Sequence, residues 1–174
     1  LDNVLDLTYW PLPQQRAEAM AKRRIGLGFT GLGDALIMLG LRYDSAAARS
    51  MAASIAATLR DAAYQASIQL AQERGAFPLF DAQPYLDAAF VRRLPESLRQ
   101  GIRAHGVRNS HLLAIAPTGT ISLAFADNAS NGIEPPFAWT YTRRKRAPDD
   151  GVVEYGVEDH AYRRFRQAGG DTER

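Results

Sequence analysis

The residues best suited to chemistry form a short hydroxyl-rich turn, Pro117–Ser122, with the sequence PTGTIS. The turn follows an apolar run at 111–116 whose length and bounding residues predict a buried strand. At a strand-to-helix turn, hydroxyls and backbone N–H groups lie at the positive end of a helix dipole, where anions bind. The alternative is a plain N-cap, in which one threonine hydroxyl accepts a hydrogen bond from a helix N–H and no ligand binds. The residues alone leave both interpretations open.

A second motif, Gly26–Gly31, matches the pattern G-x-G-x-x-G. A dinucleotide-binding fingerprint needs a strand before the glycines and an acidic residue about 20 positions later, at the end of another strand. Here the preceding AEAMAKRR is helical in pattern, and the later region falls inside a long helix. We therefore expect the glycines to allow close packing at a strand–helix turn.

Two further segments carry charge. In the loop 128–137, Glu134 is isolated, which favours a cap or an ion pair over a catalytic acid. The run Arg143–Arg146 lies beside Trp139 and Tyr141 and could form a nucleic-acid patch with stacking aromatics. Four basic residues in a nearly neutral chain more commonly form a solvated strand edge, which is our prediction.

Cysteine and histidine usage narrows the chemistry. The chain contains no Cys, which excludes disulfides, thiolate zinc sites and thiol nucleophiles within it. The three histidines, His105, His111 and His160, lack metal-ligand spacing, so we expect no metal site and place His111 in the core strand.

Composition indicates a folded chain. Its 174 residues favour one domain, and 46% hydrophobic with 23% charged residues exclude a disordered chain. The net charge of +2 gives no argument for a nucleic-acid partner. Neither a membrane-spanning stretch nor a signal-peptide pattern is recognisable, so we expect a cytoplasmic protein. Because the sequence starts at Leu1 inside an amphipathic segment, we also expect an excised piece of a longer protein.

Hydrophobic periodicity, together with the residues that start and stop helices, predicts the helices and strands that would position these residues. The order of the predicted elements is that of an α/β fold. The longest predicted helix runs from Asp44 or Ser45 to Gly75, with an apolar stripe stepping by 3 or 4. The stripe comprises Met51, Ile55, Leu59, Ala62, Ala66 and Leu70. The other predicted helices cover 13–24, 32–39, 83–93, 96–105 and 157–168, and strands are predicted at 111–116 and 139–146.

Four strings in order resemble the large catalytic chain of ribonucleotide reductases. They are RRIGLGFTGLGDALIMLGLRYDS, QERGAFPLF, RNSHLLAIAPTGTIS and NASNGIEPPFAWTYTRR, and together they extend the resemblance over nearly all of residues 1–174. The PTGTIS and TYTRR forms look like the adenosylcobalamin-dependent class II branch. The resemblance implies a helix-rich partial segment of the family's ten-stranded α/β barrel, a single partial domain whose upstream half is missing.

The resemblance also implies function. The family reduces ribonucleoside di- or triphosphates to deoxyribonucleotides for DNA synthesis by a radical mechanism, and the turn matching this one holds the substrate phosphates. The residues that inherit this role are Pro117, Thr118, Gly119, Thr120 and Ile121. The implied cofactor is adenosylcobalamin, with most contacts outside this chain, and the implied partners are nucleotide effectors, a thiol reductant such as thioredoxin and a second copy in a homodimer.

One departure from the family pattern is decisive for activity. The family's chemistry needs cysteines, and this chain has none, so we expect no catalytic residue here and no turnover by this chain alone. Two other hypotheses remain: a non-catalytic nucleotide-binding module that uses the same turn, and a basic nucleic-acid-binding helical domain centred on Arg143–Arg146.

Overall fold

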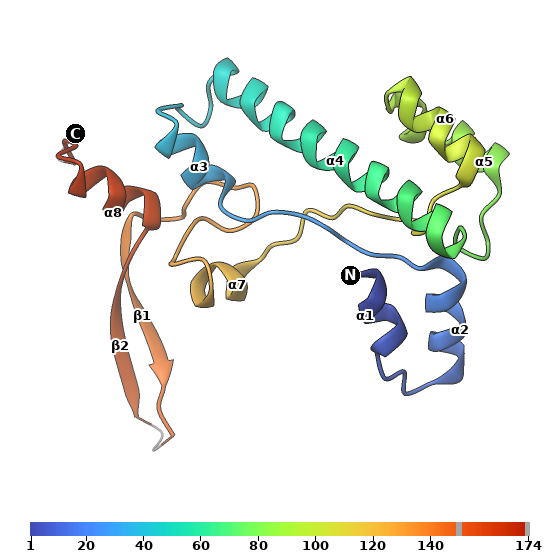
Figure 1. Cartoon of the computed structure of the whole chain (residues 1–174). Helices are drawn as coiled ribbons and strands as arrows, with labels where there is room; N and C mark the ends of the chain where they lie inside the picture. The colour runs from blue at the N-terminus through green and yellow to red at the C-terminus, as the bar shows by residue number, and fades with distance from the viewer. Residues whose placement is uncertain (149–150, 173–174) are drawn as a thin grey trace. The chain divides into compact units, whose positions relative to one another are not determined.

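The computed structural model describes residues 1–148 and 151–172 and is rich in helices (Figure 1). The helices are α1 (Asp2–Leu7), α2 (Pro13–Lys22), α3 (Leu32–Met38), α4 (Ala46–Arg74), α5 (Ala82–Asp87), the 3₁₀ turn η1 (Val91–Arg93), α6 (Glu96–His105), α7 (Gly119–Ala124) and α8 (His160–Gln167). The strands are β1 (Thr140–Arg146) and β2 (Val152–Glu158), which form an antiparallel pair. Within the described residues, no helix is both long and apolar enough to cross a membrane.

The chain divides into two compact units. Unit 1 comprises Leu1–Leu27 and Ile55–Ala114, and unit 2 comprises Gly28–Ser54 and Ile115–Arg174. That residues 1–174 form one partial domain of a larger fold stays a prediction.

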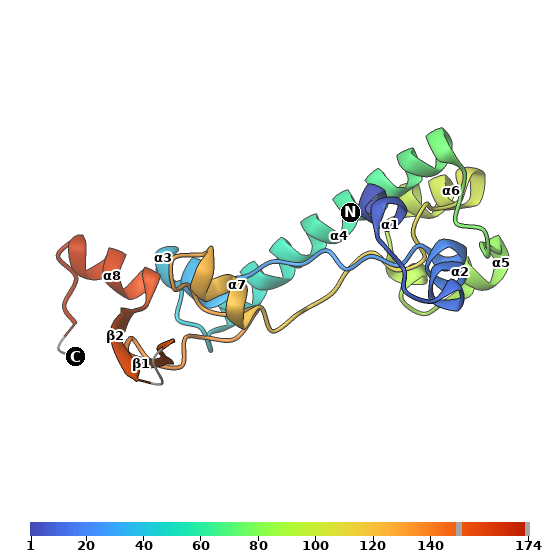
Figure 2. The same cartoon turned by 90° about the horizontal axis from the view of Figure 1, so that it is seen from below.

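The core of unit 1 forms where α5 and α6 lie against the C-terminal part of α4, as both views show (Figures 1 and 2). On α6, Leu98 and Ile102 are one turn apart and both are buried. The chain leaves α6 at Gly106, whose positive φ of 73° is the predicted helix stop. The buried core residues are Ala63, Tyr64, Ile68, Phe77, Val91, Leu94, Leu98, Ile102, Val107 and Leu112.

The predicted limits of α4 are confirmed, and its fully buried side chains lie on a different face from the predicted apolar stripe. Ser45 accepts a hydrogen bond from the Ala48 N–H at 3.1 Å, and Gly75 follows the last turn with φ of 81°. The side chains that α4 buries are instead Ala48, Ala63, Tyr64, Ser67, Ile68 and Ala71. The stripe contains most of the larger apolar side chains of α4, whereas the neighbouring face carries Ala63, Ser67 and Ala71, whose small side chains allow close approach of other elements.

Two other predictions for unit 1 need correction. The helix expected over 83–93 is interrupted, because Ala88 is extended and the chain resumes as η1, which buries Val91 before Leu94.

The strand expected over 111–116 is a single parallel bridge between Leu27 and Leu113, with the Leu27 N–H donating to the Leu112 carbonyl at 2.8 Å. One bridged neighbour covers little surface, so within this run Leu112 is buried and His111 is exposed, contrary to prediction.

Unit 2 contains the hairpin, α3, α7 and α8. The predicted strand β1 is confirmed, and Tyr141 pairs with Val157 in its register with β2. The helix predicted from Val157 begins later, because Val152–Glu158 form strand β2 and Asp159 then caps α8 by accepting from the Tyr162 N–H at 3.0 Å. Trp139 stacks on Tyr162 with ring centroids 6.0 Å apart, which ties the start of the hairpin to α8.

Candidate functional site

The hydroxyl-rich turn of unit 2 has an unusual backbone at Thr118. This residue precedes α7 with φ 49° and ψ 22°, in the left-handed region. A β-branched residue is rarely found there, and such conformations cost about 1–3 kcal/mol unless neighbouring contacts hold them. The Thr118 side chain makes no capping hydrogen bond to α7; its hydroxyl donates to the Thr30 Oγ1 at 3.2 Å. The plain N-cap is therefore not the geometry of this turn.

The first turn of α7 presents backbone donors. Gly119, Thr120 and Ile121 are its first three residues, and the first N–H groups of an α-helix have no carbonyl partner within the helix. Thr120 and Ile121 are exposed. A Cβ placed on Gly119 would meet no protein atom within 4 Å, so the space beside its backbone is open. The partner of these N–H groups is therefore water or a group that does not belong to the described residues.

Ser122 anchors α7 to the loop that carries Asn131. Its side chain is fully buried, and its hydroxyl lies 2.9 Å from the Gly119 carbonyl and 2.8 Å from the Asn131 Oδ1. The Ser122 N–H also donates to the Thr118 carbonyl at 2.8 Å. The turn is thus held on its inner side while its outer side stays open.

The loop that carries Asn131 is held in turn by the segment before α3. The Thr30 hydroxyl lies 2.9 Å from the Asn131 carbonyl, and the Gly31 N–H donates to the same oxygen at 2.6 Å. Gly31 has φ of 78°, which only glycine adopts at little cost. The segment preceding Gly26 is helix α2 and not a strand, so the dinucleotide fingerprint is not formed. An added Cβ at Gly26 would lie 2.9 Å from the Ala114 Cβ, so the close packing predicted for these glycines is confirmed at Gly26.

The rest of the loop is structural. Glu134 is exposed and accepts from the Ile133 N–H at 2.9 Å, a local contact of the capping kind that we expected. Tyr43 donates to the Ile133 carbonyl at 2.6 Å. Gly132 packs so closely that an added Cβ would lie 2.5 Å from the Ala116 carbonyl oxygen, immediately before the turn.

The basic run forms the exposed strand edge that we predicted. Arg144 pairs with Glu154 across the hairpin at 2.7 Å, and the Arg143 guanidinium lies 5.8 Å from the Tyr141 ring centre. Within residues 1–148 and 151–172, no group of three or more histidine, cysteine or acidic residues could hold a metal ion.

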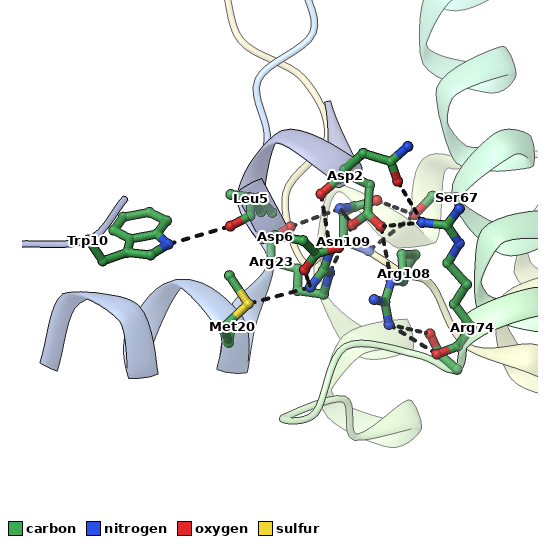
Figure 3. Close-up of polar contacts among 12 residues, drawn as sticks. Asp2, Leu5, Asp6, Trp10, Met20, Arg23, Ser67, Arg74, Arg108 and Asn109 are labelled. Carbon is green, nitrogen blue, oxygen red and sulfur yellow. Dashed lines mark hydrogen bonds and ion pairs between the residues drawn. The ribbon is translucent and has the colours of Figure 1, made fainter. Parts of the chain in front are cut away.

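Unit 1 holds a buried polar cluster that sequence reasoning missed (Figure 3). Arg23, only 4% exposed, donates from Nε to Asp2 at 2.8 Å and from Nη1 to Asp6 at 2.9 Å. Asn109 donates to Asp2 at 3.0 Å, and Arg108 does so at 3.2 Å. Burial alone would raise the pKa of Asp2, but the hydrogen bonds from Arg23, Arg108 and Asn109 outweigh it and hold that pKa below its usual value.

A cavity of about 210 Å³ lies beside this cluster in unit 1. Its lining is mainly aliphatic and includes two residues of the predicted α4 stripe, Ala66 and Leu70. The polar residues on its wall, Asp2, Ser67 and Asn109, already bond to one another or to Arg23. The cluster and the cavity wall are therefore scaffold, and the open donors lie in unit 2.

The turn's supporting residues, Thr30 and Asn131, carried no sequence signal. Thr30 and Thr118 are 88 positions apart, and no local pattern joins them. Correlated substitutions at positions 30 and 118 among related sequences are the kind of signal that could reveal such a contact.

Comparison with known proteins supports one family. The family described as "Ribonucleotide reductase, barrel domain" matches residues 1–173. The chain is 41% identical over 143 residues to the vitamin B12-dependent ribonucleoside-diphosphate reductase of Mycobacterium tuberculosis (strain CDC 1551 / Oshkosh), covering 82% of this chain and 18% of that protein. It is 36% identical over 163 residues to the ribonucleoside-diphosphate reductase large chain of Encephalitozoon cuniculi, covering 88% and 21%.

A third relative is matched over a similar share of its length. The ribonucleoside-diphosphate reductase 1 subunit alpha of Salmonella typhimurium is 32% identical over 174 residues, covering 91% of this chain and 22% of that subunit. The chain thus spans about a fifth of the length of the curated relatives it matches. Since the family match covers the chain from its first residue to residue 173, this chain belongs to the ribonucleotide reductase barrel-domain family.

Proposed function

We propose that this chain is the substrate-phosphate-binding segment of a vitamin B12-dependent ribonucleoside-diphosphate reductase. The observation that carries the proposal is the turn itself: Thr118 is held in the left-handed region without capping α7, and three backbone donors beside it are left for a ligand. The similarity to a relative named as vitamin B12-dependent, over 82% of this chain, supports the choice of reductase class.

The turn's contribution is positioning. The N–H groups of Gly119, Thr120 and Ile121 would donate to phosphate oxygens, and the Thr120 hydroxyl would add another donor. Pro117 and the Thr118 backbone set the direction in which α7 starts. Because every ribonucleotide carries the same phosphates, phosphate binding by this turn would be independent of the base. It would orient the ribose for reduction at its 2′ carbon.

The remaining parts of the reaction lie outside this chain. The ten-stranded α/β barrel would be completed by other parts of the reductase, as would the radical cysteine and the reducing cysteine pair, since this chain has no Cys. Adenosylcobalamin would supply the radical when bound. The cavity of about 210 Å³ in unit 1 is smaller than an ordinary cofactor pocket and mainly aliphatic, so it does not fit that group.

The wider setting follows from the same proposal. The protein would supply deoxyribonucleotides for DNA synthesis in the cytoplasm, with a thioredoxin-like thiol reductant, nucleotide effectors and a second copy of the chain as partners. Removed from the rest of the reductase, this segment would bind phosphate without turnover.

The substitution Gly119→Ala, made in the full-length reductase, tests the proposal. The added methyl meets no protein atom within 4 Å, and alanine favours a helix over glycine, so folding should be unchanged or slightly improved. A phosphate seated on the turn would be displaced, and losing one hydrogen bond to a charged group, about 1.5–3 kcal/mol, raises KM at least about tenfold.

The matched control is Gly156→Ala in β2, where the added methyl also has no neighbour within 4 Å. Its KM should equal that of the parent enzyme. Thr120→Ala, which removes an exposed hydroxyl, should raise KM in the same direction as Gly119→Ala with the folding stability retained. An unchanged KM in both turn variants would refute the assignment of the phosphates to this turn.

A further inference from the structure

Two carboxyl side chains are buried together in unit 2, where α3 meets the start of α8. Asp34, in the first turn of α3, and Asp159, the N-cap of α8, are each only 3% exposed. Neither of them contacts the N–H groups of the hydroxyl-rich turn that we propose for phosphate binding. A pair of buried acids with no evident role in binding calls for a separate explanation.

Asp34 joins three segments of the unit. One of its carboxylate oxygens accepts from the Ser130 N–H at 2.8 Å, and the other accepts from the Ala161 N–H at 3.2 Å. Its own N–H donates to the Ser130 hydroxyl at 3.2 Å. Asp34 therefore fastens both the loop at Ser130 and the first residues of α8 to α3.

Asp159 joins α8 to the hairpin. Its carboxylate accepts from the Tyr162 N–H at 3.0 Å, and its N–H donates to the Trp139 carbonyl at 2.8 Å. The Asp34 and Asp159 carboxyls accept from the adjacent N–H groups of Ala161 and Tyr162, so the two buried acids lie side by side at the start of α8. A hydrogen bond between two carboxyl groups requires that one of them keeps its proton.

Within the described residues, no cation neutralises this pair. On α8, His160 and Arg163 are both engaged with Asp127 of the preceding loop, and Arg166 pairs with Glu158 at the end of β2. From α3 the group that faces Asp159 is Asp34 itself. Two unpaired buried negative charges would be costly, so a shared proton is the stable arrangement.

We propose that Asp34 and Asp159 share one proton and act as a pH-sensitive latch that holds α8 and the attached hairpin to α3. With the proton in place, a single carboxyl–carboxylate hydrogen bond closes the junction. When it leaves, two like charges face each other in a buried site and the junction opens more often.

The pH range of the latch follows from Asp159. Burial, together with the charge of Asp34, raises the pKa of Asp159 to about 6 from an ordinary 3.8. A raised pKa means that the closed state binds the proton more tightly than the open state. The added stability is therefore complete below pH 3.8 and is lost as the pH rises through about 6. Between pH 5 and 7.5 the closing equilibrium should weaken about tenfold.

The test is amide hydrogen exchange on the complete chain, read at Ala161 and Tyr162 and corrected for intrinsic exchange. In the parent chain, protection at these amides should fall about tenfold from pH 5 to pH 7.5. Asp159→Asn keeps the acceptor for Tyr162 and supplies a permanent N–H toward Asp34. Its protection should be independent of pH and should exceed that of the parent chain at pH 7.5.

Two controls separate the latch from other titrations. His160 is close by, and imidazoles ordinarily titrate in the same range, so His160→Gln must retain the tenfold change if the carboxyl pair is its source. Asp81→Asn alters an exposed N-cap on α5 and should leave exchange at α8 unchanged.

Loss of the pH dependence in His160→Gln, or its survival in Asp159→Asn, would overturn the proposal. If Asp159→Asn does not fold, a carboxyl-carbon NMR titration of the parent chain gives the same decision. A midpoint near 6 at Asp159 supports the latch, and a midpoint near 4 refutes it.

Discussion

Replacing Arg23 with methionine should expose how much unit 1 depends on its buried charges. The guanidinium of Arg23 donates to both Asp2 and Asp6, and its Nη2 also reaches the Asp2 carbonyl at 3.1 Å. Methionine fills similar volume without a charge. The change therefore leaves packing nearly intact and removes the main partner of a carboxylate whose side chain is only 5% exposed.

The size of the effect can be worked out from what Asp2 retains. Removing one partner of a buried ion pair typically costs about 3–5 kcal/mol, because the other charge stays buried. Asp2 keeps its hydrogen bonds from Arg108 and Asn109, which places the loss near the lower end, at about 3 kcal/mol. Asp6 has a largely open side chain that water can solvate, so its contribution is small.

Urea unfolding followed by tryptophan fluorescence measures this loss. Trp10 lies in unit 1 and Trp139 in unit 2, so a Trp139→Phe background confines the signal to unit 1. The midpoint should fall with little change in slope. The matched control Arg24→Met removes a neighbouring arginine that is 55% exposed, and it should change the unfolding free energy by less than about 0.5 kcal/mol. A loss below about 1 kcal/mol for Arg23→Met would refute the reasoning.

The remaining predictions concern packing. Ile102→Ala empties a position with 0% exposure in the core of unit 1 and should cost about 2–5 kcal/mol in urea unfolding, whereas Ile115→Ala, at 71% exposure, should change little. Gly132→Ala forces a methyl to within 2.5 Å of the Ala116 carbonyl oxygen and should cost about 1–3 kcal/mol in thermal unfolding, while Gly156→Ala should be neutral. Equal stability of the two members of either pair would contradict the packing described.

Local signals in the sequence predicted where α2 begins and where α4 and α6 end. Pro13 begins α2, and Gly75 and Gly106 follow the ends of α4 and α6 with positive φ, because proline and glycine constrain the backbone at their own positions. The predicted start of α8 at Val157 is too early, because Val157 and Glu158 belong to β2 and the helix starts only after the cap at Asp159.

What sequence could not predict depends on contacts between distant segments. The buried face of α4 is chosen by the partners it packs against, and the Arg23 cluster joins residues separated by as many as 107 positions. The hydroxyls of Pro117–Ser122 and the resemblance to the reductases predict a phosphate site at this turn, and that role stays a prediction. The Thr118 conformation and its contact with Thr30 come only from the fold.

The most direct measurement is a crystal structure of the full-length reductase with a ribonucleoside diphosphate bound. The account predicts phosphate oxygens within hydrogen-bond distance of the Gly119, Thr120 and Ile121 nitrogens, with the Thr118–Thr30 contact retained. Phosphates bound at another site, or these three amides occupied by protein groups in the substrate complex, would contradict it.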